Sequence, residues 1–406
     1  MSFASGMRAA TVVLLVVVSG AVFAQTLSES TYRRLTKVHE LIGEENYAEA
    51  ISRLDKLLPS TKYSPYETAM VYQTYGFIFA QQGNYSKAAD YFKQAINLGA
   101  LPEQQVESMK YNLGQFQIAV EEYREGVKTL EDYFATAKHP IPADARVLLA
   151  TAYAQLKNYR KALPPLSQAI REHKDPKEMW FQLKLALHYE LKDYRSCATT
   201  LLEMISRFPL KEEYWKQLSG MFMEIKKDAE ALAILGLADR KGFLDDEKEI
   251  KNLGNMYLYL DIPFKAARIV DQGLKSGVLP ATEENWELLS NAWTGARETD
   301  RAIAALAKAA ELTRDGELVL RLAYLYVQKE DWSKVIPTLS RARQLGVNNE
   351  GEAAMLQGIA SAELGEFEKA LEAFRVAARF DDTKEDALGW INHARSLQAE
   401  SALDEG

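Results

Sequence analysis

This chain of 406 residues has little cysteine, proline and glycine, and fewer basic than acidic residues. It therefore lacks the composition of disulfide-rich, fibrous or nucleic-acid-binding proteins. A single cysteine excludes an internal disulfide framework and a cysteine-cluster metal site. The 12 prolines and 22 glycines are spread out, so no collagen-like or proline-rich segment occurs. The 49 basic residues are outnumbered by 57 acidic ones, which disfavours a nucleic-acid partner because phosphate neutralisation needs a basic face. A 47% hydrophobic content remains, typical of an ordered globular protein.

The beginning of the chain, Met1–Ala24, has the pattern of a secretory signal peptide. Arg8 precedes the apolar run Thr11–Val18, and small residues follow as far as Ala24. This order predicts Sec-type export with cleavage before Gln25, and therefore a periplasmic protein. The alternative is an uncleaved membrane anchor, but about 15 apolar or small residues fall short of the ~20 that span a bilayer. We expect no integral membrane segment after signal cleavage.

Beyond the leader, one sequence unit recurs through nearly the whole chain. The segments Gly76–Ala88, Ala150–Ala162 and Gly358–Ala370 share the same order of small, aromatic and Lys-Ala residues. Self-similarity at a nearly fixed period is the signature of a repeat array. Ten copies align, at similar intervals, on an anchor position that is most often aromatic: Tyr47, Tyr85, Tyr123, Tyr159, Tyr194, Asp228, Pro263, Thr299, Trp332 and Phe367.

Each unit has the apolar periodicity of two antiparallel amphipathic helices joined by a short turn. Small residues three positions after each anchor predict that the two helices approach closely. These residues are Ala50, Ala88, Gly126, Ala162, Cys197, Ala231, Ala266, Ala302, Val335 and Ala370. A single pair cannot bury its apolar face, so pairs must stack on one another and the stack needs a cap. We expect Glu385–Ala399 to supply that cap, with Leu388, Ile391, Ala394 and Leu397 on its apolar side.

Prolines fall inside three predicted second-helix positions, Pro164, Pro165 and Pro337. A proline in a helix interior removes one backbone hydrogen bond, at a cost of about 3 kcal/mol. We therefore expect kinks or shortened helices at these positions.

The residues within a unit resemble the tetratricopeptide repeat (TPR), a helix-turn-helix unit with the pattern W-x₂-L-G-x₂-Y…A-x₃-F. One copy has Tyr72, Gly76 and Phe79 followed by Ala88 and Phe92. The resemblance implies an all-α fold, a right-handed TPR solenoid of about ten helix-turn-helix repeats with a C-terminal capping helix. We expect the signal peptide over residues 1–24, the repeat array over 25–383, and the capping helix and tail over 384–406.

Catalytic motifs are missing from the sequence. There is no His-Glu-x-x-His, Gly-x-Ser-x-Gly, phosphate loop, Gly-x-Gly-x-x-Gly or EF-hand loop. The five histidines fall in five different units or loops. Cys197 occupies a small-residue position, which favours packing over a nucleophilic role. We therefore expect no catalytic residue, metal or cofactor, and an enzyme or enzyme inhibitor built on the array has no supporting constellation.

Stacked first helices in a repeat array line a concave groove. By their position in the repeat, the residues of this groove combine aromatic anchors with amide and ammonium donors, which suits an extended peptide or a helix. They are Phe77, Tyr111, Gln115, Gln182, Tyr189, Lys216, Lys251, Asn255, Asn291 and Tyr324. The alternative is that these are merely exposed residues of a scaffold whose contacts lie elsewhere.

A second resemblance covers the full mature chain. The segments Leu27–Leu35, Leu113–Gln115, Ala154–Pro164 and Tyr257–Arg268 are similar to exported bacterial TPR proteins encoded beside TonB, ExbB and ExbD in Gram-negative bacteria. The resemblance implies a periplasmic adaptor for protein or peptide partners, with TonB-like or ExbD-like periplasmic segments as ligands. The alternative is a scaffold for envelope assembly or secretion, acting on lipoproteins, cell-wall enzymes or polysaccharide machinery.

Overall fold

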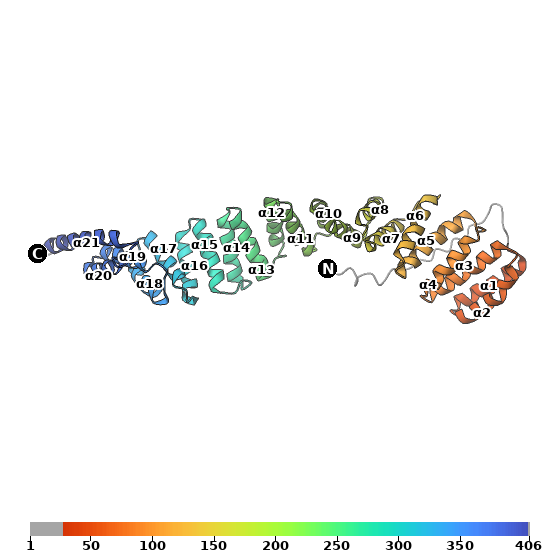
Figure 1. Cartoon of the computed structure of the whole chain (residues 1–406), viewed down its shortest axis with the longest axis horizontal. Coiled ribbons are helices and arrows are strands. Elements are labelled where there is room, and N and C mark those ends of the chain that lie inside the picture. Colours follow the sequence, from red (N-terminus) through yellow and green to blue (C-terminus); the bar gives the residue numbers. More distant parts are fainter. Residues whose placement is uncertain (1–26, 405–406) are drawn as a thin grey trace. The chain divides into compact units, whose positions relative to one another are not determined.

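The computed structural model of the chain describes residues 27–404, and within that range every regular element is a helix. The predicted signal peptide lies outside the described residues. Twenty-one α-helices and one short 3₁₀-helix follow one another along the chain (Figure 1). Over the described range, no helix combines the length and apolar character needed to cross a membrane. The chain divides between Pro209 and Leu210 into two compact units.

The first unit contains five antiparallel helix pairs. Within each pair the two helices pack together, and the second helix also packs on the first helix of the next pair. The bounds are α1 (Glu29–Gly43), α2 (Tyr47–Leu57), the 3₁₀-helix η1 (Leu58–Thr61), α3 (Pro65–Gln81), α4 (Tyr85–Asn97), α5 (Glu103–Ala119), α6 (Tyr123–Thr136), α7 (Ala143–Gln155), α8 (Tyr159–Glu172), α9 (Glu178–Glu190) and α10 (Tyr194–Arg207).

The second unit repeats this arrangement with five more pairs and one additional helix. Here too the second helix of one pair contacts the first helix of the next. The bounds are α11 (Glu212–Glu224), α12 (Asp228–Arg240), α13 (Glu247–Tyr259), α14 (Pro263–Ser276), α15 (Glu283–Gly295), α16 (Thr299–Leu312), α17 (Gly316–Gln328), α18 (Trp332–Leu345), α19 (Glu350–Glu363), α20 (Phe367–Ala377) and α21 (Lys384–Asp404).

The all-α repeat fold predicted from the sequence is confirmed. Each of the ten anchor positions, from Tyr47 to Phe367, is the first residue of the second helix in its pair. All ten small residues three positions later are buried, and nine of them, all except Gly126, are fully shielded from solvent. The repeat period therefore sets both where the second helices begin and where the paired helices meet.

The closest approach within a pair depends on glycine in several first helices. A Cβ atom added at Gly76 would lie 2.2 Å from the ring of Phe92, and one added at Gly358 would lie 2.4 Å from the ring of Phe374. Where serine takes this position, its hydroxyl donates a hydrogen bond to a backbone carbonyl of the facing helix: Ser219 to Ala231, and Ser290 to Ala302, each at 2.9 Å. Eight pairs have glycine, alanine or serine at this position, and the first and fifth pairs have Val38 and Leu185.

The turn inside each pair contains a left-handed residue two positions before the anchor. Glycine fills this position in only two pairs, at Gly83 and Gly365. The other eight pairs place a charged residue there, for example Lys157 at φ 58°. Because L-residues with a Cβ atom pay about 1–2 kcal/mol for this conformation, eight turns of the array carry backbone strain.

Of the two outcomes expected for the proline-containing helices, shortening is wrong, and a kink stays a prediction. Helix α8 runs unbroken through Pro164 and Pro165, and α18 runs unbroken through Pro337. Each has 14 residues, as long as the longest second helices without an internal proline. Pro164 and Pro337 lie on the exposed side of their helices, where water can bind the carbonyls that lose their partners.

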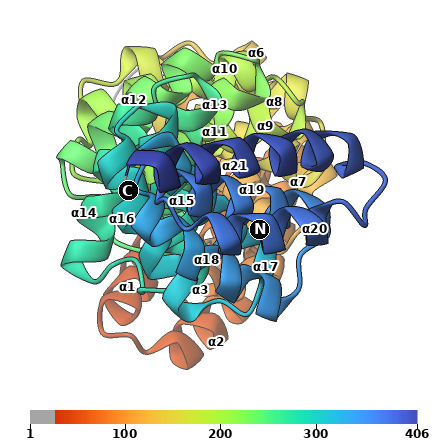
Figure 2. The ribbon, with the colours of Figure 1, turned by 90° about the vertical axis from the view of Figure 1, so that its left-hand side faces the viewer.

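Helix α21 packs on α20 at the end of the second unit, as Figure 2 shows. Its Ala387, Ile391 and Ala394 are buried, and Trp390 stacks on Phe374 with ring centroids 5.7 Å apart. Leu388, which the sequence pattern placed on the apolar side, is 50% exposed. The helix covers the last pair mainly with small side chains and one tryptophan.

We predict that Gly358→Ala lowers the free energy of unfolding of the chain by about 1–3 kcal/mol, because the added methyl group overlaps the buried ring of Phe374. Gly389→Ala is the matched control, since nothing lies within 4 Å of its added Cβ atom. This second change should raise stability by up to ~1 kcal/mol through helix propensity. Urea denaturation followed by circular dichroism measures both, and equal midpoints would contradict the close-approach argument.

We also predict that Lys157→Gly stabilises the chain by about 0.5–1 kcal/mol, because glycine adopts the left-handed turn conformation without steric cost. The same substitution at the exposed Lys128, inside α6, should destabilise by about 1 kcal/mol. The melting temperature should therefore rise for Lys157→Gly and fall for Lys128→Gly. A lower melting temperature for Lys157→Gly would contradict the argument that the turn is strained.

Candidate partner-binding surface

The first helices of the second unit are joined to one another by a row of side-chain contacts. Lys216 on α11 reaches Glu249 on α13 at 2.5 Å, and Lys251 on α13 reaches Glu284 on α15 at 2.6 Å. The two pairs are equivalent, because the same sequence interval, close to one repeat, separates each lysine from its glutamate. We call this row, with its continuation below, the first-helix ladder.

The ladder continues from α15 to the next two first helices, α17 and α19, with different chemistry. Arg321 on α17 pairs with Glu287 on α15 and also donates to the side-chain oxygen of Asn291 at 2.6 Å. The hydroxyl of Tyr324 on α17 donates to Glu352 on α19 at 2.5 Å. Four of the five groove residues predicted in this unit are thus already bonded to a neighbouring repeat or to one of its ladder residues.

The titration behaviour of two ladder residues reflects these contacts. Burial lowers the pKa of Lys216, but the hydrogen bond and negative charge of Glu249 outweigh it, so this pKa lies above its usual value. Burial, the hydrogen bond to Glu352 and the charge of that carboxylate together raise the pKa of Tyr324. Both groups stay protonated at neutral pH and act as donors within the ladder.

In the first unit, the predicted groove aromatics contribute to packing. Phe77 on α3 meets Phe92 edge-on, with ring centroids 5.3 Å apart. Tyr111 on α5 stacks on Tyr133 at 5.8 Å, burial raises its pKa, and its hydroxyl has a side-chain hydrogen bond with Gln115. Phe77 and Tyr111 thus pack the two helices of a pair together, whereas Gln115 bonds within its own helix; only part of each side chain reaches the surface.

Three of the ten predicted residues are largely exposed on first helices without being part of the ladder. Tyr189 on α9 is 56% exposed, with only one ring edge against Tyr194. Gln182 on the same helix and Asn255 on α13 are also exposed. The first-helix faces therefore offer a few separate contact points, between rows of residues that are engaged within the array.

The sequence prediction missed the acidic members of the ladder. Glu249 and Glu284 neutralise the predicted lysines Lys216 and Lys251. Glu352 accepts from Tyr324, and Glu287 pairs with Arg321, which was not predicted either. The recurrence of a glutamate at the same interval after Lys216 and after Lys251 is visible in the sequence and was a usable signal. This recurrence indicates ion pairs only if two successive first helices lie side by side, as they do in the structure.

Cys197 has the surroundings of a packing residue. It is fully buried, its Sγ lies 3.8 Å from the carbonyl oxygen of Leu185, and burial raises the pKa of its thiol to about 11. A thiol with such a pKa is protonated at neutral pH and is a poor nucleophile. In the part of the chain that the structure describes, no group of three or more His, Cys, Asp or Glu side chains is placed to hold a metal ion.

Comparison with known proteins identifies the repeat. Models of the tetratricopeptide repeat family match residues 70–98, 110–178 and 320–385. Among solved structures, the chain is similar to a tetratricopeptide repeat protein from Parabacteroides merdae, with 14% identity, a TM-score of 0.38, and coverage of 74% of this chain and 100% of that one. It is also similar to YrrB, described as a TPR protein with an unusual peptide-binding site, with 16% identity, a TM-score of 0.37, and coverage of 48% and 94%. No curated protein matches the chain.

We predict that Lys216 and Glu249 are energetically coupled by about 0.5–1 kcal/mol, which a double-mutant cycle of Lys216→Met and Glu249→Gln measures. Since the folded-state pKa of Lys216 is raised, its contribution is fully present below the ordinary lysine pKa of 10.5 and is lost as the pH rises through the folded-state value. The stability gap between wild type and Lys216→Met should therefore shrink above about pH 10.5.

The exposed Lys248 on α13 provides the control for this cycle. Lys248→Met removes the same charge without removing a ladder contact, so its effect on the unfolding midpoint should be small. A coupling of zero between Lys216 and Glu249, or an equal loss of stability in both lysine variants, would show that the ladder does not join the repeats energetically.

Proposed function

We propose that this chain, which contains tetratricopeptide repeats, is a periplasmic adaptor that holds components of a TonB–ExbB–ExbD energy-transduction complex together. The observation that carries the adaptor role is the array itself, ten helix pairs in register from Glu29 to Ala377. TPR proteins mediate protein–protein interactions, and in a stacked array every pair adds contact residues to those of its neighbours.

The periplasmic location is supported by the leader pattern, in which Arg8 precedes an apolar run and small residues end at Ala24. The Ton partners are supported by the resemblance of segments such as Leu27–Leu35 and Tyr257–Arg268 to exported TPR proteins encoded beside the Ton genes. In this proposal the ligands are the periplasmic segments of TonB-like or ExbD-like proteins, and the adaptor supplies contact without chemistry.

Among the residues predicted for the groove, Tyr189 in the first unit and Asn255 in the second are exposed, and each is proposed as a contact for a segment bound to its own unit. Tyr189 presents most of its ring to solvent, and tyrosines that become buried on binding are frequent energetic centres of protein interfaces. The exposed amide of Asn255 both donates and accepts hydrogen bonds, which suits a peptide backbone. Lys251 is a poorer choice of contact, because a ligand must first displace Glu284 from it.

We predict that crosslinking in intact cells, with affinity capture of the tagged chain and mass spectrometry, enriches TonB, ExbB or ExbD. The double variant Tyr189→Ala with Asn255→Ala should reduce this enrichment roughly tenfold, because it removes an aromatic anchor and a backbone-binding amide. Tyr63→Ala is the matched control, since Tyr63 is 85% exposed but lies in a turn outside the first helices. N-terminal sequencing of the captured chain should begin at Gln25.

Capture of lipoproteins, cell-wall enzymes or polysaccharide-export proteins without any Ton component would replace the Ton proposal with the envelope-assembly alternative. Ton components captured equally well by wild type and by the double variant would leave the adaptor role in place and exclude the first-helix contacts. A chain that retains residues 1–24 in the membrane fraction would contradict signal cleavage.

A further inference from the structure

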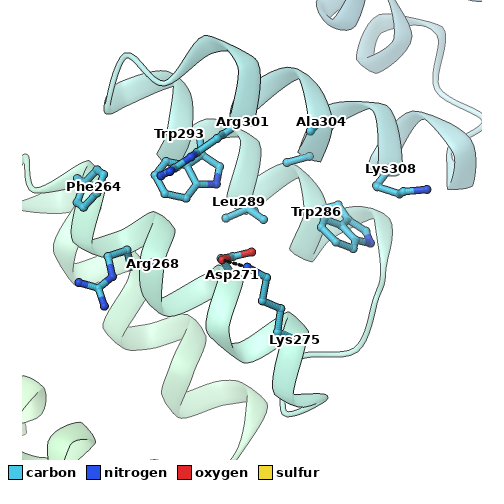
Figure 3. A pocket seen from close by; sticks show the side chains of 11 residues that line it. Phe264, Arg268, Asp271, Lys275, Trp286, Leu289, Trp293, Arg301, Ala304 and Lys308 are labelled. Atoms are coloured by element: carbon cyan, nitrogen blue, oxygen red, sulfur yellow. Dashed lines mark hydrogen bonds and ion pairs between the residues drawn. The ribbon is translucent and has the colours of Figure 1, made fainter.

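A pocket of about 710 Å³ opens between the second helices α14 and α16, with α15 as its floor. It lies within the second unit and uses a different side of α15 from the ladder residues Glu284 and Glu287. Figure 3 shows side chains of α14 on one side, Trp286, Leu289 and Trp293 beneath, and side chains of α16 on the other. We call it the second-helix pocket.

The charge of the second-helix pocket is opposite to that of the chain. Four basic residues line it, Arg268, Lys275, Arg301 and Lys308, against one acidic residue, Asp271. Lys275 neutralises Asp271 at 2.6 Å. An excess of positive charge is thus concentrated on a protein whose net charge is −8.

The basic side chains differ in how far they are engaged. Lys308 pairs with Glu311 at 3.1 Å, and the Nε of Arg301 lies 3.8 Å from Glu298. Arg268 is exposed, and its side chain has no hydrogen bond or ion pair with any residue that the structure describes. Its guanidinium group is therefore available to an external anion.

The floor of the pocket is apolar and aromatic. Leu289 and Trp293 are buried, and Phe264, 45% exposed, meets Trp293 edge-on at 5.6 Å. The guanidinium of Arg301 lies over the Trp293 ring, 4.7 Å from its centroid (Figure 3). This cation–π contact holds the guanidinium against the ring, and a guanidinium group can still donate to a carboxylate through the N–H groups in its plane.

We propose that the second-helix pocket binds an acidic segment of a partner protein, with an aromatic or aliphatic side chain against Phe264 and Trp286, the two aromatic lining residues that remain partly exposed, and carboxylates at Arg268 and Arg301. Charge complementarity favours the carboxylates, and the apolar floor favours a peptide over a small free anion, which leaves that floor unused. This inference rests on the proposed function in one respect, that the partner is a protein, and it adds a binding surface on the second helices.

The corresponding furrow of the first unit shows what is particular to this pocket. It lies between α6 and α8 over α7 and has a volume of about 680 Å³. At the repeat position of Asp271 it has Glu131, and at that of Lys275 it has Ala135, so no lysine neutralises the carboxylate, which accepts instead from the Tyr153 hydroxyl. Arg146 replaces Trp286 in the floor. The first-unit furrow thus lacks the tryptophan pair and keeps an acidic group.

Fluorescence anisotropy with the mature full-length chain tests the proposal. The probe is a fluorescein-labelled peptide, Gly-Ser-Asp-Glu-Phe-Asp-Glu-Leu-Gly-Ser. Two companion peptides carry Asn and Gln in place of the acids, or Ala in place of Phe and Leu. We expect the acidic–aromatic peptide to bind more tightly than either companion, and its affinity to fall with added salt.

Arg268→Glu and Arg301→Glu should each weaken binding of the acidic–aromatic peptide roughly tenfold, as expected for the loss of a charge-assisted contact. Lys265→Glu is the matched control, because it makes the same charge change on an exposed residue of α14 that does not line the pocket. It should change the affinity less than twofold, because salt screens the interaction between an exposed charge outside the pocket and the bound peptide. Circular dichroism of each variant verifies that the helices are intact.

No binding of the acidic–aromatic peptide at millimolar concentration would overturn the proposal, and so would equal weakening by Lys265→Glu and Arg268→Glu. The crosslinking experiment separates this result from the proposed function. Ton partners captured equally by wild type and Arg268→Glu would exclude the pocket while the adaptor role stands. If no partner is captured by any form, the adaptor role fails, and the peptide titration still decides whether the pocket binds acidic segments.

Discussion

The rest of the structure depends on how closely two helices of one pair approach each other. Buried small residues such as Ala88 on the second helix, and glycine or serine at positions such as Gly76 on the first, allow that approach. Rings such as Phe92 then fill the space beside the contact, where no additional Cβ atom fits. Because most pairs are built in this way, they present similar faces to their neighbours, and equivalent residues recur in rows along a unit.

The two kinds of helix take different roles in the second unit. First helices carry rows of donors and acceptors that bond to the next repeat, as Lys216 does to Glu249. Second helices leave furrows between them, and one furrow has a tryptophan floor and an unpaired arginine, Arg268. Aromatic and basic residues are the types that indicate a binding surface in a sequence. On the first helices they bond to the next repeat, and on the second helices Arg268 has no ion pair among the described residues.

Much of the fold was predictable from the sequence, because it depends on short-range periodicity. The anchors mark the start of every second helix, and the small column marks where helices meet. The unbroken α8 was not predictable, since it depends on which side of the helix Pro164 occupies. The division at Pro209 leaves no trace in the repeat spacing, because the interval from Tyr194 to Asp228 across it is an ordinary one. For the candidate site, the sequence correctly places Lys216 and Lys251 on first helices. That glutamates of the next repeat pair with them could not be predicted, because it depends on how the first helices stack.

The ion pairs of the ladder link adjacent first helices, and the same lysines could bind a ligand, so the two interactions compete. A ligand that binds Lys251 must release Glu284, and so removes a link between two adjacent first helices. By thermodynamic reciprocity, a tensile force that separates these helices frees the lysine and strengthens the same ligand's binding. Separation of two adjacent first helices would therefore break the ion pair between them and leave its lysine free to bind a ligand.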